Sequence, residues 1–284
     1  MTVRGNLRAS TLRGSILRDF TSVSIRETMR LDEAVAEHAG VTRSRARSLI
    51  IAGRVRVDGA PVTKPGANVQ PSAAIAVERP KPYVSRGGEK LEGALDAFGI
   101  DPRGMRVLDV GASTGGFTDC LLSRGAVHVV ALDVGYGQLA WSLREDPRVT
   151  IVERTNFRLL QDDAFGHEFD LITIDASFIS VVTMIARARA YLRGTLVALI
   201  KPQFEAGPER LGAGGVVRDS SVHRAVLRET IQATSALGLQ AIGLVRSPLA
   251  GPAGNAEFFV HLSADPETQY VIDEELLDKL TAPT

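Results

Sequence analysis

Cysteine is nearly absent from this sequence, with Cys120 alone among 284 residues. A single cysteine cannot build an internal disulfide framework or a cysteine-rich zinc site. The five histidines show no metal-ligand spacing, so we expect no metal. No apolar run approaches the roughly 20 residues of a membrane span, and the first ten residues lack the apolar stretch of a secretory signal. These absences favour a cytoplasmic protein that works without a membrane.

Net charge is also absent, because 33 lysines and arginines balance 33 aspartates and glutamates. The balance hides an asymmetry, since residues 1–90 carry 16 basic and 8 acidic side chains and residues 91–284 carry 17 and 25. A basic front part favours contact with a polyanion, although a solvated basic surface would produce the same count. The 44% of hydrophobic residues is enough for a sizeable core and argues against wholesale disorder.

The front part begins with a segment of no regular period, residues 1–28, which predicts a flexible N-terminal arm. Apolar residues and His38 then follow a helical stripe from residue 31, and Gly40 ends it. Thr42 or Ser44 can cap a second helix, whose alanine, leucine and isoleucine face inward. We expect a small domain of helices and strands over residues 29–79.

The period changes to two at the strand RVRV, and Asp58-Gly59 predicts a tight turn after it. The run SRxxxLIxxGxVxVDG resembles the S4-like RNA-binding domain, named for a ribosomal protein. In that family, basic residues of the second helix and the next strand meet RNA phosphates, contacts that supply salt-dependent affinity and little sequence information. The resemblance implies RNA contacts at Arg43, Arg45, Arg47, Arg54, Arg56 and Lys64.

Residues 80–88, PKPYVSRGG, combine prolines with a glycine pair and predict an inter-domain linker. Beyond it, seven short apolar runs alternate with helical segments across residues 89–264, from RVLDVG to AEFFVHLS. This alternation predicts an α/β, Rossmann-like domain with a largely parallel seven-stranded sheet and helices on both faces. Residues 265–284 are acidic and predict a terminal tail or helix.

A glycine-rich turn, DVGASTGGFTD, follows the first strand of this domain. Its spacing is not that of the dinucleotide fingerprint, and no phosphate-gripping lysine follows. Asp133 ends the next strand, 24 positions after Asp109, where a carboxylate can accept both hydroxyls of a ribose. Two carboxylates beside a glycine turn indicate a ligand with a ribose and an amine but no phosphate, a description that S-adenosyl-L-methionine fits.

The strings YVSRGGEKLEGAL, LDVGYGQLAWSLR, DASFIS, LIKPQFEAG and GPAGNAEFF closely resemble the TlyA family, which is related to FtsJ-like RNA 2′-O-ribose methyltransferases. The similarity extends from about residue 30 to residue 262. It implies a cofactor loop, a ribose and adenine region, and an adenine-side residue. The residues of the cofactor loop are Gly111, Ser113, Gly115, Gly116, Phe117 and Thr118, those of the ribose and adenine region are Asp133 and Val134, and the adenine-side residue is Asn156. Asp109 completes the set of expected cofactor-binding residues. For Phe117 and Val134, core packing is an equally good explanation.

The catalytic tetrad of that family, Lys-Asp-Lys-Glu, falls on Lys90, Asp175, Lys201 and Glu257. The last three lie in or beside predicted strands, where an unpaired charge would be costly and a paired set is tolerable. A structural salt-bridge network is the alternative. The hypothesis is that Lys201 orients and helps deprotonate a ribose 2′-hydroxyl with Asp175 beside it, while Lys90 and Glu257 hold the network.

The resemblance therefore implies an S-adenosylmethionine-dependent 2′-O-methyltransferase of ribosomal RNA, modifying cytidine in the small subunit, the large subunit or both. Ribosomal RNA or ribosomal subunits would be its partners. Two alternatives stay open: a haemolysin or pore-forming protein, because relatives often carry that name, and an RNA-binding assembly factor without catalysis. The linker has the tyrosine of KPYV where the family usually has a tryptophan, and GGEK where the family usually has GAHK. These two departures weaken the case for linker-driven switching.

Overall fold

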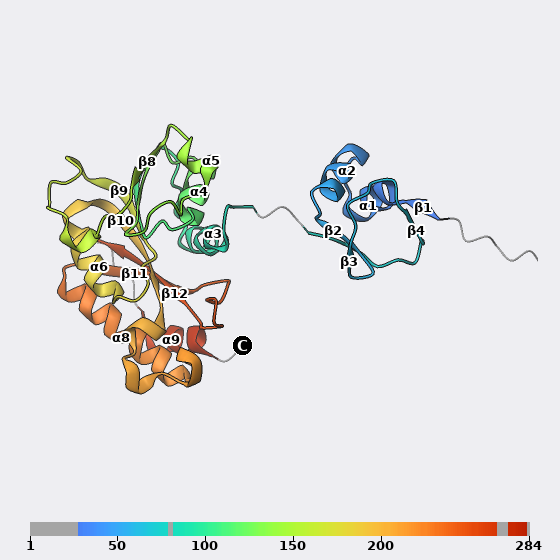
Figure 1. Ribbon diagram of the computed structural model, residues 1–284. Coiled ribbons are helices and arrows are strands. Elements are labelled where there is room, and N and C mark those ends of the chain that lie inside the picture. Colours follow the sequence, from blue (N-terminus) through green and yellow to red (C-terminus); the bar gives the residue numbers. More distant parts are fainter. Residues whose placement is uncertain (1–27, 79–81, 266–271, 283–284) are drawn as a thin grey trace, which may run out of the picture. The chain divides into compact units, whose positions relative to one another are not determined.

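The computed structural model describes residues 28–78, 82–265 and 272–282. The chain forms two compact units, Met1–Pro80 and Lys81–Thr284 (Figure 1). Residues 1–27 of the predicted arm lie outside the described residues. Within those that are described, no helix has the length and apolar character needed to cross a bilayer.

The first unit packs two helices on short strands. Its elements are β1 (Met29–Arg30), α1 (Leu31–Ala39), α2 (Arg43–Ile51), β2 (Val55–Val57), β3 (Ala60–Pro61), β4 (Asn68–Val69) and β5 (Ile75–Val77). β1 pairs with β4, and β2 lies between β3 and β5, all antiparallel. The core consists of the apolar stripes of both helices with Val55 and Val69, as the helical and strand periods predict.

Local signals in the first unit act as the sequence indicates, with one exception. Gly40 ends α1 at φ 62°, and the Thr42 hydroxyl caps α2 by accepting from the Arg45 N–H. Asp58 and Gly59, at φ 50° and 81°, form the tight turn between β2 and β3. His38 is exposed rather than buried, because α1 ends one residue later and its last turn lies beyond the core.

The second unit is built on the sheet order β11-β12-β10-β9-β6-β7-β8. All neighbouring strands are parallel except β12, which runs antiparallel to β10 and β11. The strands are β6 (Arg106–Val110), β7 (His128–Leu132), β8 (Val149–Val152), β9 (Phe169–Ile174), β10 (Leu192–Ile200), β11 (Gln240–Arg246) and β12 (Phe258–Ser263). The seven predicted strands are therefore confirmed. Strand order reverses at β6, where such sheets place their ligand crevice.

Helices cover both faces of this sheet (Figure 1). They are α3 (Arg86–Phe98), α4 (Gly116–Ser123) and α5 (Trp141–Arg144), then α6 (Val181–Ala188), α7 (Pro202–Glu205), α8 (Ser220–Ala236) and α9 (Glu274–Thr281). Alternate strand residues divide between two cores, so that Val129 packs with α3 and α4 and Val130 packs with α6 and α8. Both sides of each central strand are thus buried, which explains their continuous apolar runs.

The predicted linker 80–88 is too long at its C-terminal end. α3 begins at Arg86, capped by the Ser85 hydroxyl, and its first turn includes the glycine pair. A Cβ at Gly88 would overlap the buried ring of Tyr83. The glycines therefore permit close packing rather than breaking the chain, and the Val84 N–H donates to Asp119 of α4 at 2.8 Å.

At the other end, the predicted acidic tail or helix includes α9, while residues 266–271 and 283–284 lie outside the described residues. Leu277 of α9 is buried in the core that α8 shares. An ion pair at 2.7 Å joins Glu274 to Arg228 of α8. This helix is therefore packed onto the domain rather than projecting from it.

Candidate active site

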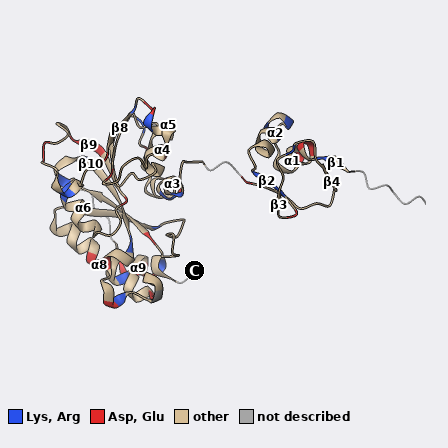
Figure 2. Cartoon of the chain, viewed as in Figure 1, with Lys and Arg blue, Asp and Glu red and all other residues tan. Residues whose placement is uncertain are grey.

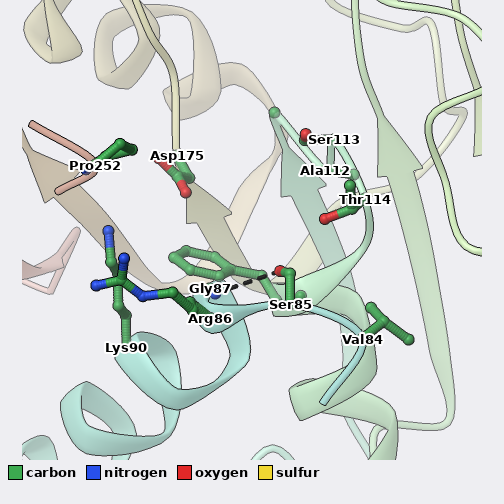
Figure 3. A pocket seen from close by; sticks show the side chains of 13 residues that line it. Val84, Ser85, Arg86, Gly87, Lys90, Ala112, Ser113, Thr114, Asp175 and Pro252 are labelled. Carbon is green, nitrogen blue, oxygen red and sulfur yellow. Dashed lines mark hydrogen bonds between the residues drawn. The ribbon is translucent and has the colours of Figure 1, made fainter. Parts of the chain in front are cut away.

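Two adjoining cavities lie at the carboxyl ends of β6, β7 and β9. The smaller, about 400 Å³, is bounded by the first turn of α3 and the glycine turn after β6 (Figure 3). The larger, about 490 Å³, extends over the ends of β7 and β9. Gly111, Ser113 and Asp175 line both, so the two cavities form one continuous site around the end of β6.

The glycine turn is shaped by backbone conformations that other residues rarely adopt. Gly111, Ser113 and Gly115 have φ of 87°, 48° and 95°. A Cβ on Gly111 would overlap the carbonyl oxygen of Asp175, and one on Gly116 would overlap the Ser85 hydroxyl. Glycine at these points therefore lets β6, β9 and α3 approach one another around the site.

Asp133 lies in the wall of the larger cavity with its carboxylate held in place. Its Oδ2 accepts from the Ser113 N–H at 2.8 Å, and its Oδ1 accepts from the Gly135 N–H at 2.6 Å. Each carboxylate oxygen can accept a further hydrogen bond. A fixed acceptor at this edge has the chemistry that ribose hydroxyls require.

Asp109 does not line either cavity, which corrects the expectation that it contacts the cofactor. Its carboxylate is fully buried and accepts from the hydroxyls of Thr118 at 2.7 Å and Thr173 at 3.0 Å. Burial raises the pKa of Asp109 to about 7, against the opposing effect of the two threonine hydroxyls. Thr118 is equally buried and also lies outside the cavity walls, so both residues support the turn from beneath.

The other predicted cofactor residues occupy different positions. Gly116 and Phe117 line the smaller cavity, and Phe117 is 3% exposed and packs on Phe259. Val134, 72% exposed, and Asn156 line the larger one. Gly115 precedes α4 and lines neither cavity. A Cβ at this position would meet Leu143.

The four tetrad residues form two ion pairs at the site. Lys90 Nζ lies 2.5 Å from Glu257 Oε2, and Lys201 Nζ lies 2.5 Å from Asp175 Oδ1. The side chains of Lys90 and Glu257 are 10% and 1% exposed, whereas those of Lys201 and Asp175 are 11% and 25% exposed. The first pair is therefore the more enclosed. Lys90 and Asp175 line the smaller cavity, so each pair has one member at the cavity wall (Figure 3).

Sequence reasoning missed several residues of the site. Ser177 accepts a 2.9 Å hydrogen bond from Lys201. Phe178, at φ 64° and 89% exposed, lines the larger cavity, and Ser85 and Arg86 line the smaller one. All four lie within the strings DASFIS and YVSRGGEK, so the signal was present but assigned to their charged neighbours.

Because Asp109 and Asp133 lie in different positions, their substitution should change cofactor affinity by different amounts. Asp133→Ala removes the fixed acceptor, and we expect cofactor affinity to fall on the order of tenfold or more, since a hydrogen bond to a charged group contributes about 1.5–3 kcal/mol. Asp109→Asn keeps the shape beneath the turn, and we expect affinity within about threefold of wild type. Calorimetric titration with S-adenosylmethionine measures both. Equal losses in the two variants would contradict this division.

Asp109 also predicts a pH dependence of stability. Because its folded pKa of about 7 lies above the unfolded value of 3.8, its contribution to stability is complete below pH 3.8 and declines until the pH passes about 7. Asp109→Asn cannot ionise, so its melting temperature relative to wild type should rise between pH 4 and 7 and then level off. A constant difference across that range would refute the raised pKa.

In the first unit, where lysines and arginines are blue in Figure 2, the predicted RNA-contact residues differ in the partners that they have. Arg43 forms ion pairs with Asp32 at 3.2 Å and Glu33 at 2.7 Å. Asp32 is buried, and hydrogen bonds from Arg30 and then Arg43 lower its pKa to about 2. Arg43 therefore holds α2 to α1, and its contact with RNA stays a prediction.

The remaining basic residues of that set are more available. Arg45 and Arg47 are exposed on α2, and Lys64 is exposed before β4. Arg54 is half-buried, and Arg56 donates to the Gly59 carbonyl at 3.1 Å and lies 3.8 Å from Glu78. Over the described part of the chain, no group of three or more histidine, cysteine or acidic side chains is arranged to hold a metal ion.

The chain is similar to known proteins over both units. Residues 83–264 match the FtsJ-like methyltransferase model, and residues 29–75 match the S4 domain. The Mycobacterium tuberculosis protein 16S/23S rRNA (cytidine-2'-O)-methyltransferase TlyA is 49% identical over 78% of this chain and 85% of its own. Hemolysin A of Brachyspira hyodysenteriae is 40% identical over 82% and 99%. A Streptococcus thermophilus protein whose solved structure carries a hemolysin name is 37% identical, covers 90% and 95%, and has a TM-score of 0.69.

The family match covers the whole seven-stranded sheet and all four residues of the two ion pairs. The S4 match covers the helix pair, β2 to β4 and the first residue of β5. The expected order of an S4-like domain before an FtsJ-like methyltransferase domain is thereby confirmed. The chain belongs to the FtsJ-like methyltransferase family, as a TlyA-type member with an S4 domain in front.

Proposed function

We propose that this protein transfers a methyl group from S-adenosylmethionine to the ribose 2′-oxygen of a cytidine in ribosomal RNA. The observation that carries the proposal is the pairing of Lys201 with Asp175 at the wall shared by two adjoining cavities. In this proposal the larger cavity holds the methyl donor and the smaller cavity holds the ribose. The identity to a named rRNA cytidine-2'-O-methyltransferase supports the choice of substrate.

The residues present fit this cofactor. Gly111 and Gly116 let the glycine turn pack closely against Asp175 and Ser85 at the cavity wall, and Asp133 supplies a fixed acceptor for ribose hydroxyls. Val134 and Asn156 line the same cavity, where they would contact the adenine. When bound, the cofactor supplies a sulfonium methyl group that is already strongly electrophilic.

The protein must therefore position the ribose hydroxyl and remove its proton. Lys201 Nζ is held by Asp175 Oδ1 at 2.5 Å and by the Ser177 hydroxyl at 2.9 Å, so its direction is fixed. A lysine that accepts a proton must first lose its own to solvent. The Asp175 carboxylate orients the Lys201 amino group rather than storing that proton, because aspartic acid is a far stronger acid than a lysine ammonium. Lys90 and Glu257 keep the neighbouring wall in place. Alignment of the hydroxyl with the methyl group is expected to be the largest contribution.

Methyl transfer to ribosomal subunits tests the proposal. Unmodified small and large subunits are incubated with the protein and radiolabelled S-adenosylmethionine, and the labelled nucleotide is then mapped. We expect label on the ribose of a cytidine in at least one subunit. Cofactor binding without incorporation into either subunit would instead favour an RNA-binding assembly factor.

The hemolysin names among the relatives raise a second candidate, membrane lysis. It is separable by experiment, because lysis would need no S-adenosylmethionine. Purified protein added to erythrocytes without cofactor should release no haemoglobin if the methyltransferase function is the relevant one. Release that persists in the Lys201→Ala variant would establish lysis as an independent activity.

The exposed arginines of α2 are expected to bind RNA phosphates. Replacing Arg45 and Arg47 together with glutamine should lower affinity for ribosomal subunits on the order of tenfold and reduce the salt slope of binding by about 1.4–1.8, two phosphate contacts' worth. Filter binding over a range of salt concentrations measures both quantities. Arg43→Gln is the matched control, because it breaks the ion pairs to Asp32 and Glu33. Its melting temperature should fall, whereas its salt slope should stay close to that of wild type.

A further inference from the structure

Arg86 is a basic side chain at the smaller cavity that forms no ion pair with any carboxylate the structure describes. It is exposed, and its Nη2 donates a 2.8 Å hydrogen bond to the carbonyl oxygen of Ala250. Among the described residues it has no ion-pair partner. A guanidinium carries five N–H donors, so one bond leaves most of them for a ligand. The bond to Ala250 holds Arg86 of α3 against the loop between β11 and β12.

The positive charge of Arg86 is the charge at this cavity that the two ion pairs of the tetrad do not balance. Lys90 is paired with Glu257 and Lys201 with Asp175, so the four tetrad residues carry no net charge between them. Arg86 and Lys90 are the basic residues among the described residues that line the cavity. Arg86 therefore gives the cavity an excess positive charge next to a neutral reaction centre.

The position of Arg86 favours the nucleic acid over the cofactor. In Figure 3, Arg86 lies with Lys90 on one side of the cavity, Ser113 and Thr114 of the glycine turn lie on the other, and Asp175 lies between them. The glycine turn and Asp133 form the expected cofactor wall. The exposed Arg86 side chain lies on the other side of the cavity from that wall.

The chemistry of RNA provides an anion at that place. The 2′-oxygen is attached to the carbon next to the one that bears the 3′-phosphate, so the reacting atom and a phosphate are separated by only a few bonds. Guanidinium groups bind phosphate oxygens with two parallel hydrogen bonds, which fixes orientation as well as position. A ribose seated over the tetrad would bring this phosphate to the same end of the cavity.

We propose that Arg86 binds the phosphate beside the target ribose and so positions the 2′-oxygen against Lys201 and Asp175. The proposal rests on the function proposed above and adds a substrate contact to it. Arg86 is a positioning residue, since no bond forms or breaks at its side chain. Its phosphate contact would be independent of base identity.

The test compares Arg86→Gln and Arg86→Lys with Arg103→Gln, an exposed arginine before the amino end of β6 with no ion pair among the described residues. Methyl transfer to unmodified subunits is measured from roughly 50 to 200 mM salt. For R86Q we expect kcat/KM to fall about tenfold, mainly through KM, and the salt slope to become shallower by about 0.7–0.9. R86K should recover the slope but only part of kcat/KM, because an ammonium lacks the two-pronged geometry. R103Q should match wild type.

Cofactor affinity separates this assignment from its rival. Calorimetry with S-adenosylmethionine should give R86Q a Kd within about twofold of wild type. A salt slope unchanged in R86Q would overturn the proposal, and so would a loss of activity matched by a loss of cofactor affinity, which would assign Arg86 to the cofactor carboxylate. Wild-type protein that binds cofactor but methylates neither subunit would defeat the proposed function itself, whereas an active wild type with an unaffected R86Q defeats only the role of Arg86.

Discussion

Replacing Lys201 with alanine should lower kcat for methyl transfer by roughly 10²–10⁴-fold at saturating cofactor, the range over which positioned acid–base groups contribute. The substitution removes the amino group that contacts Asp175 Oδ1 at 2.5 Å and the Ser177 hydroxyl at 2.9 Å. Asp175 is 25% exposed but its Oδ1 is buried. Removing the lysine side chain opens space through which water can reach this oxygen, so the fold should survive. Initial rates with unmodified ribosomal subunits give the measurement.

Two further variants identify what Lys201 contributes. Lys201→Arg keeps a positive charge beside Asp175 but cannot lose its proton near neutral pH, so it should be nearly as inactive as the alanine variant if proton transfer matters. Lys279→Ala, at an exposed position of α9, is the control and should be fully active. Near-normal turnover in Lys201→Ala at saturating cofactor would refute the assignment.

Replacing Glu257 with glutamine should reduce the free energy of unfolding by about 3–5 kcal/mol, because it leaves the ammonium of Lys90 buried without its partner. The two side chains are 1% and 10% exposed and lie 2.5 Å apart. Thermal unfolding of the full chain should show a decrease in melting temperature on the order of 10 °C. Activity should fall as well, since Lys90 lines the cavity.

A double variant separates stability from catalysis at this pair. Lys90→Met combined with Glu257→Gln removes both charges at similar volume, and we expect it to recover most of the lost stability. It should remain poorly active, because the wall beside Asp175 no longer carries a charge pair. Restored activity in the double variant would show that the pair is only a structural ion pair, the alternative that the sequence left open.

Local signals in the sequence were sufficient for much of the fold. The seven apolar runs became the seven strands, and Gly40, Thr42 and Asp58-Gly59 end, cap and turn the chain as their chemistry requires. These features depend on residues a few positions apart, so backbone geometry and side-chain period determine them directly. The glycine pair at 87–88 predicted part of a linker, but it lies in the first turn of α3. A glycine that permits close packing looks identical in sequence to one that breaks a helix, so the local pattern could not distinguish the two.

What only the tertiary structure decided is which of several similar residues meet. The sequence by itself determined the family, the order of the two units and a set of charged candidates. It could not show that Lys90 pairs with Glu257, 167 positions away, or that Asp109 is buried beneath the turn while Asp133 lines the cavity. Nor could it show that Arg43 has ion-pair partners whereas Arg86 has none within the part of the chain that the structure describes. Such pairings follow from strand order and helix packing, which bring distant segments together through the burial of apolar faces rather than through any local pattern.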